Sequence, residues 1–189
     1  DNFIESGKDL DLFPFEVNEE NVNIVVSEIY DEYPVLWEYD FKVDITGSKG
    51  VHGFPIEYFP PGERDNPYPK ENYIGLNQQT STYSKEELKN AIFGDMLHAL
   101  NDDENWTELK EYYLGERTQE DLMIDQKAYN TSVTTYGETR SFEDWFKTSR
   151  SDAYIREALK GNPEWLEGIN ENQKAILDQM AEYLKWGEY

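Results

Sequence analysis

The chain has 189 residues, with 40 acidic against 17 basic side chains and a formal net charge of −23. This length suits one domain with a sizeable core, and 38% hydrophobic and 15% aromatic residues argue against disorder despite the acidity. The charge disfavours direct binding to nucleic acid or anionic membranes, which both require a basic surface. The absence of cysteine excludes disulfides, thiolate catalysis and iron–sulfur ligation.

The first part of the chain is predicted to be an arm followed by a helix. Residues 1–16 are interpreted as an extended arm, and residues 17–189 as a single domain. Residues 18–32 space their apolar side chains three and four positions apart, which predicts a helix. Asn18 can cap the beginning of this helix, and Pro34 ends it.

Three strands are predicted next. Apolar side chains alternate with polar ones at about 36–45 and again at 54–59, and a short apolar segment covers 73–77. The glycine-rich residues 46–53 supply turn chemistry, so the first two strands are expected to form a hairpin. The expected product is a small antiparallel or mixed sheet.

From residue 84 onward every predicted element is a helix. Apolar spacing and capping residues predict helices over residues 84–100, 106–114, 118–136, 141–146, 151–159 and 170–186. In the third of these, the residues expected to face inward are Leu122, Ile124, Ala128 and Tyr129. The sequence therefore predicts an α+β fold, in which a small sheet precedes a helical bundle in a mostly helical C-terminal half.

The helix at residues 84–100 carries the best candidate for a chemical site. Ser84 and Glu87 form a capping-box pattern, and the second half of the helix is apolar on nearly every side. Asp95 and His98 interrupt this apolar run. At about 100° per residue, Asp95 falls within the core-facing stripe, and His98 lies beside it one turn further on. A buried carboxylate is costly unless it is paired, so we expect Asp95 and His98 to form a buried, hydrogen-bonded pair.

The spacing of these residues suggests a modified metal-binding motif. His-Glu-x-x-His on a helix places two imidazoles on one face for zinc, with the glutamate as general base. Here the frame reads Gly94-Asp95-Met96-Leu97-His98, in which glycine replaces the first histidine and aspartate replaces the glutamate. The second histidine is kept.

This helix and the segments after it resemble the zincin-like domains of large virion proteins of tailed phages. The resemblance covers roughly residues 70–185. The segments that carry it are residues 87–92, 96–100, 140–146, 149–156, 162–165 and 171–174. It implies a zincin-like fold with a degenerate metallopeptidase-like site, in a structural or ejected component of a phage particle.

A catalytic zinc needs three protein ligands, and the helix supplies His98 and one carboxylate, Asp95. The chain has only two histidines, His52 and His98, so a histidine-rich site is excluded. In zincins a further ligand comes from later in the chain, and the resemblance makes Asp152 the candidate. We expect no bound cofactor; zinc held by Asp95, His98 and Asp152 is the alternative.

Asp152 also has a purely structural interpretation. Arg150 and Arg156 flank it in the sequence, and cations this close usually pair with a buried carboxylate. We prefer this interpretation to a metal ligand. The Asp95 and His98 pair would then belong to a retired active site, in a catalytically silent domain.

Three functions remain open. The first is a catalytically silent, zincin-like structural or ejected component of a phage particle. The second is an active metal-dependent hydrolase acting on peptide or peptidoglycan, with Asp95 as the general base. The third is an acidic inhibitor or DNA mimic that binds a basic partner.

Partners and location follow from the same observations. The expected partners are other virion proteins or basic proteins. With no apolar run of about 20 residues and no signal-peptide pattern, we expect no membrane insertion and a location in the virion or the host cytoplasm. Because the first residue is Asp1 and not methionine, the chain is interpreted as processed or as part of a longer polypeptide.

Overall fold

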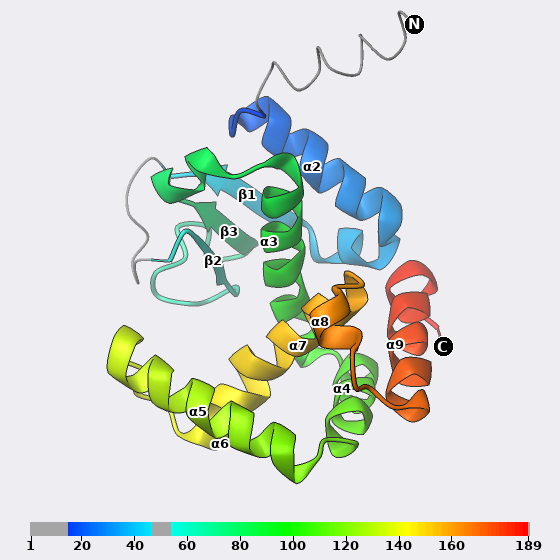
Figure 1. Cartoon of the computed structure of the whole chain (residues 1–189). Coiled ribbons are helices and arrows are strands. Elements are labelled where there is room, and N and C mark those ends of the chain that lie inside the picture. The colour runs from blue at the N-terminus through cyan, green and yellow to red at the C-terminus, as the bar shows by residue number, and fades with distance from the viewer. Residues whose placement is uncertain (1–14, 47–53, 189) are drawn as a thin grey trace, which may run out of the picture. The chain divides into compact units, whose positions relative to one another are not determined.

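The computed structural model describes residues 15–46 and 54–188 (Figure 1). The predicted arm at 1–16 and the predicted turn at 46–53 therefore lie almost entirely outside the described residues. The described residues have an α+β fold that is 66% helical, with a three-stranded sheet and eight α-helices. The coarse fold class predicted from the sequence is thus confirmed.

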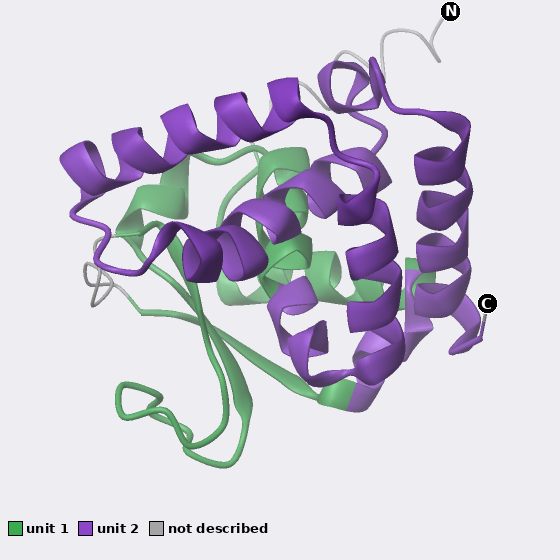
Figure 2. Cartoon of the chain, turned by 90° about the horizontal axis from the view of Figure 1, so that it is seen from below, with its two compact units in different colours: residues 1–32, 39–95 green, residues 33–38, 96–189 purple. Residues whose placement is uncertain are grey.

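The chain divides into two compact units, which Figure 2 shows in different colours. Unit 1 comprises Asp1–Glu32 and Tyr39–Asp95, and unit 2 comprises Tyr33–Glu38 and Met96–Tyr189. The single-domain interpretation of residues 17–189 stays a prediction.

Unit 1 contains the sheet and two helices. Its elements are α2 (Glu19–Glu32), β1 (Phe41–Ile45), β2 (Ile56–Phe59), β3 (Asn72–Leu76), the 3-10 helix η2 (Gln78–Thr82) and all but the end of α3 (Lys85–His98). Unit 2 is helical and includes the end of α3. Its other elements are the 3-10 helices η1 (Pro34–Tyr39), except for the last residue of η1, and η3 (Ala99–Asp102), the π-helix η4 (Phe146–Arg150), and α4 (Glu104–Gly115), α5 (Gln119–Tyr136), α6 (Phe142–Trp145), α7 (Ser151–Leu159), α8 (Pro163–Leu166) and α9 (Glu171–Trp186).

The sheet has the strand order β1-β3-β2. β1 runs parallel to β3, with Val43 opposite Ile74, and β2 runs antiparallel to β3, with Tyr58 opposite Ile74. The predicted hairpin between the first two strands is therefore wrong, because each of them pairs with β3. β3 takes the central position because its residues from Tyr73 to Leu76 are all buried, whereas each edge strand has one buried residue, Phe41 in β1 and Phe59 in β2.

The first strand is shorter than predicted, since it begins at Phe41 and not near residue 36. The preceding residues form η1, and Trp37, expected to alternate along a strand, is 68% exposed. Pro34 has a fixed φ that suits the first position of a helical turn. Asp40 then adopts a positive φ of 47°, which separates the turn from the strand.

The predicted helices are confirmed, because their signals are local. Thr118 and Asp121 form a capping box at the beginning of α5, and Asn170 and Gln173 form another at α9. The structure adds the short helix α8, which the sequence analysis did not predict. None of the helices in the described part of the chain combines the length and the apolar composition that a membrane span requires.

Candidate functional site

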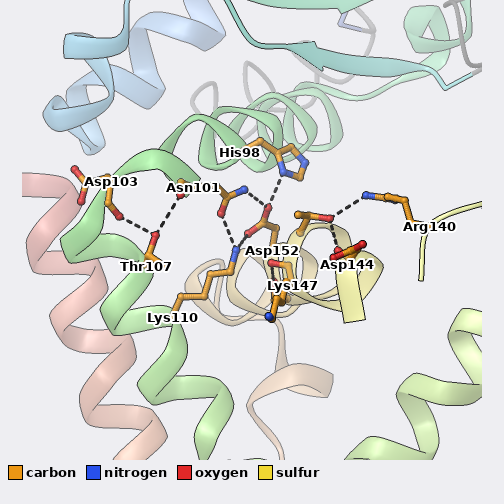
Figure 3. A network of polar contacts seen from close by, with 11 residues as sticks. His98, Asn101, Asp103, Thr107, Lys110, Arg140, Asp144, Lys147 and Asp152 are labelled. Atoms are coloured by element: carbon orange, nitrogen blue, oxygen red, sulfur yellow. Dashed lines mark hydrogen bonds and ion pairs between the residues drawn. The ribbon is translucent and has the colours of Figure 1, made fainter. Parts of the chain in front are cut away.

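A buried polar network in unit 2 centres on Asp152 of α7, which is 4% exposed (Figure 3). Its Oδ2 atom lies 2.6 Å from Nδ1 of His98 and accepts a hydrogen bond of 3.0 Å from Nδ2 of Asn101. Its Oδ1 atom accepts a hydrogen bond of 2.5 Å from Nζ of Lys110. Lys110 also donates to Oδ1 of Asn101 at 2.7 Å. The carboxylate therefore joins α7 to the end of α3, to η3 and to α4.

The local fold places each partner of Asp152. His98 is the last residue of α3, and Asn101 lies in the 3-10 turn that follows. Lys110 is on the buried face of α4, which begins at the cap formed by Asp103. Thr107 donates to the backbone oxygens of Asn101 and Asp103, so the turn and the first part of α4 hold each other in place.

A π-helical turn precedes Asp152. Residues Phe146–Arg150 form this turn, and the buried Ser151 hydroxyl donates a 2.6 Å hydrogen bond to the backbone oxygen of Lys147. π-helical turns are rare and occur frequently at functional sites. The turn and Asp152 together make this part of unit 2 the leading candidate for a functional region.

The charges around Asp152 keep it ionised. Burial raises the pKa of Asp152, but the hydrogen bonds and the electrostatic attraction from His98 and Lys110 together outweigh burial and lower the pKa below its ordinary value of 3.8. The carboxylate and the ammonium of Lys110 form an ion pair that is almost fully removed from solvent.

This lowered pKa gives a testable dependence of stability on pH. A carboxyl whose pKa is lower in the folded than in the unfolded state contributes stability above its unfolded pKa and loses it as the pH falls through the folded pKa. We expect the difference in unfolding free energy between the parent and Asp152→Asn to shrink as the pH falls below about 4, where the carboxyl of the parent becomes protonated. Urea unfolding at a series of pH values measures it. A difference that stays constant down to the acid limit of folding would contradict the role assigned to Asp152.

The structure brings two of the three predicted site residues together. His98 and Asp152 are in contact, although they are 54 positions apart in the sequence. Asp95 lies on α3 and is half-buried, as His98 is, and the predicted hydrogen bond between Asp95 and His98 stays a prediction. Within residues 15–46 and 54–188, no three His, Cys, Asp or Glu side chains gather as a metal site requires.

The arginine pairing predicted for Asp152 is wrong. Arg150 donates instead to Asp125 at 3.1 Å, and Arg156 donates to Glu157 at 3.2 Å. Residues two positions apart do not share a helix face, so Arg150 points away from Asp152. The true cation, Lys110, was missed because it comes from 42 positions away in the sequence.

One sequence signal could have identified Lys110. It stands among the buried residues Trp106, Leu109 and Tyr113 of α4, so a charge lies on the apolar face of a helix. Such a charge is rarely fully buried without a partner. The same reasoning singled out Asp95 on α3, and it applies equally to a lysine.

A second buried carboxylate, Asp125 of α5, is 0% exposed. Its Oδ2 atom accepts a hydrogen bond of 2.5 Å from Arg117, and its Oδ1 atom accepts bonds of 3.1 Å from Arg150 and 2.7 Å from the hydroxyl of Tyr154. Both guanidinium groups lie over the Tyr154 ring, at 4.1 and 4.7 Å from its centroid. These contacts offset the cost of burying the carboxylate.

The inward face predicted for α5 is therefore partly wrong. Leu122 and Ile124 are exposed, Ala128 and Tyr129 are half-buried, and Asp125 is the buried residue of the helix. The residue that α5 buries is polar, because it contacts Arg117, Arg150 and Tyr154. Apolar spacing therefore does not reveal which face of this helix is buried.

Comparison with protein-family models, with curated proteins and with solved structures finds no match to this chain.

The chemistry of the Asp152 network is therefore the basis for a functional conclusion. A carboxylate bonded to a histidine is the arrangement that orients an imidazole for proton transfer or metal binding. Here the other oxygen of that carboxylate is bonded to a lysine ammonium.

Proposed function

We propose that this chain is a catalytically silent, zincin-like domain that serves as a structural or ejected component of a phage particle. The observation that carries the silent character is the buried ion pair between Lys110 and Asp152. The ammonium already balances the carboxylate, and it would repel a metal ion bound to the same group. Gly94 stands where the motif requires the first histidine, so the helix also lacks that ligand.

Two further features support the zincin-like part of the proposal. Asp152, the residue that the resemblance assigned as a later ligand, is in contact with His98. The order of elements, a small sheet followed by the helix that carries Gly94-Asp95-Met96-Leu97-His98, is the order expected for a zincin.

The net charge of −23 fits a particle component that works beside packed DNA, since a strongly acidic protein is repelled by the duplex. Its partners would be other virion proteins or basic proteins. Mass spectrometry of purified phage particles tests this assignment. Peptides of the chain at a constant ratio to the capsid protein are expected, and their absence from particles, despite their presence in infected cells, would contradict it.

The other two functions predict different observations. An active hydrolase would retain about one zinc per chain and cleave peptide or peptidoglycan. An acidic inhibitor would form a tight complex with a basic protein, and salt would weaken it. Elemental analysis after purification without chelator distinguishes the hydrolase from the silent domain, for which we expect far less than one metal ion per chain.

Restoring the missing ligand tests the zincin-like assignment directly. Gly94→His would place an imidazole one turn before His98, because residues four positions apart share a helix face. Gly94 is buried, so the variant is expected to lose about 1–3 kcal/mol of stability through overpacking. It should nevertheless gain measurable zinc affinity through the two imidazoles at positions 94 and 98, and calorimetry measures this gain.

Gly115→His is a matched control, because it adds the same side chain to α4, where a new Cβ would meet nothing within 4 Å. It should fold normally and gain no zinc affinity. A folded Gly94→His variant that binds zinc no better than Gly115→His would mean that the Gly-Asp-x-x-His spacing is coincidental.

A further inference from the structure

A surface groove of about 730 Å³ lies in unit 2, beside the Asp152 network. Its lining comes from η3 and α4 on one side and from α6 and η4 on the other. The lining residues are Asn101, Thr107, Lys110, Glu111, Leu114, Gly115, Phe142, Glu143, Phe146, Lys147 and Thr148. This volume falls within the range of about 300–1,000 Å³ that is typical of small-molecule sites.

The walls of the groove are mainly apolar. Leu114, Phe142 and Phe146 are each half-buried, and the two phenylalanine rings are stacked with their centroids 5.8 Å apart. Gly115 leaves open space, since a Cβ added there would meet no atom within 4 Å. The π-helical turn η4 brings Phe146, Lys147 and Thr148 to this groove, and such turns occur frequently at functional sites.

One polar group of the lining has unused hydrogen-bonding capacity. Lys110 is buried, and its ammonium carries three N–H donors. Two of them donate to Asp152 and Asn101. In the part of the chain that the structure describes, no acceptor is found for the third donor. Buried donors in folded proteins normally have an acceptor, so a ligand in the groove would complete the set.

The charges of the lining indicate what kind of acceptor fits. The lining contains two lysines, Lys110 and Lys147, and two glutamates, Glu111 and Glu143, so its formal charges cancel. Nζ of Lys147 is 2.8 Å from Oε1 of Glu143, and Lys110 forms its ion pair with Asp152, which is not part of the lining. A ligand with a full negative charge would therefore gain little at Lys110, in a protein that is itself strongly acidic. A neutral acceptor such as a carbonyl group gains the hydrogen bond and is not repelled by the negative charge of the protein.

We propose that this groove binds a neutral, mostly apolar small molecule whose carbonyl group accepts a hydrogen bond from Lys110. The apolar body of the ligand packs against Leu114, Phe142 and Phe146. This site is separate from the proposed role in a phage particle and does not depend on it.

Nile red is a suitable probe, because it is an uncharged apolar dye with a carbonyl group, and its fluorescence rises in apolar surroundings. We expect saturable binding to the full chain with one dye per chain. Gly115→Trp fills the groove from a helix position that has no left-handed backbone conformation, and it should weaken binding about tenfold or more. Gly115→Ala removes the same glycine without filling the groove and should bind as the parent does.

Two controls keep the test decisive. If circular dichroism shows that Gly115→Trp folds poorly, Glu111→Trp replaces it. Glu111→Trp fills the groove from an exposed position one turn earlier on α4. Diphenylhexatriene, an uncharged hydrocarbon without an acceptor, should bind at least several-fold more weakly than Nile red. Equal Nile red binding by the filled variants and by Gly115→Ala would overturn the site, as would no binding to the parent. Equal affinity for the two dyes would overturn the role of Lys110.

Discussion

Replacing Lys110 with methionine is expected to lower the free energy of unfolding by about 3–5 kcal/mol, the range seen when one partner of a buried ion pair is removed. Methionine keeps most of the length and apolar character of lysine, so the loss of the charge dominates the effect. Asp152 would remain buried beside His98 and Asn101 without the cation that balances it. Urea unfolding at neutral pH measures the change.

Lys147→Met is the matched control for this prediction. Lys147 also pairs with a carboxylate, Glu143, but their side chains are 66% and 74% exposed. Exposed pairs contribute about 0–1 kcal/mol, so the control should change stability little. The double variant Lys110→Met/Asp152→Asn should be more stable than the sum of the two single effects predicts, because the uncompensated charge is gone. If Lys110→Met costs no more than Lys147→Met, the network does not stabilise unit 2.

Asp125→Asn is expected to have an effect of similar size, about 3–5 kcal/mol. Asparagine fits the same space, but it removes the negative charge that lies between the guanidinium groups of Arg117 and Arg150. Asp125 is also the single buried residue among those described for α5. The substitution should therefore destabilise α5 first, through local unfolding of this helix.

Amide hydrogen exchange separates this local effect from global unfolding. In Asp125→Asn the amides of α5 should exchange faster than those of α9, whose Leu177, Met180 and Leu184 are buried. Glu120→Gln, a substitution at an exposed position in the first turn of α5, should leave the amide exchange rates of both helices unchanged from those of the parent. An unchanged exchange rate for α5 in Asp125→Asn would show that the arginine cluster does not hold the helix.

The sequence by itself determined the helices of this protein, because their signals lie within a few residues. The capping box of Thr118 with Asp121 is complete within four positions, and Gly137 ends the same helix in the left-handed conformation. The α+β class followed from the change between strand and helix periods. The strand boundary near residue 36 failed, since the alternation of Trp37, Tyr39 and Phe41 runs across a 3-10 helix and a strand.

Only the tertiary structure decided which partners the buried charges have and how the strands are ordered. Asp152 meets Lys110 across 42 positions and His98 across 54, and no local pattern encodes such distances. β3 enters between β1 and β2 because it is the most buried strand, a property that depends on what packs against its two faces. Periodicity locates the helices and strands, whereas the partner of a buried charge depends on which elements the fold brings together.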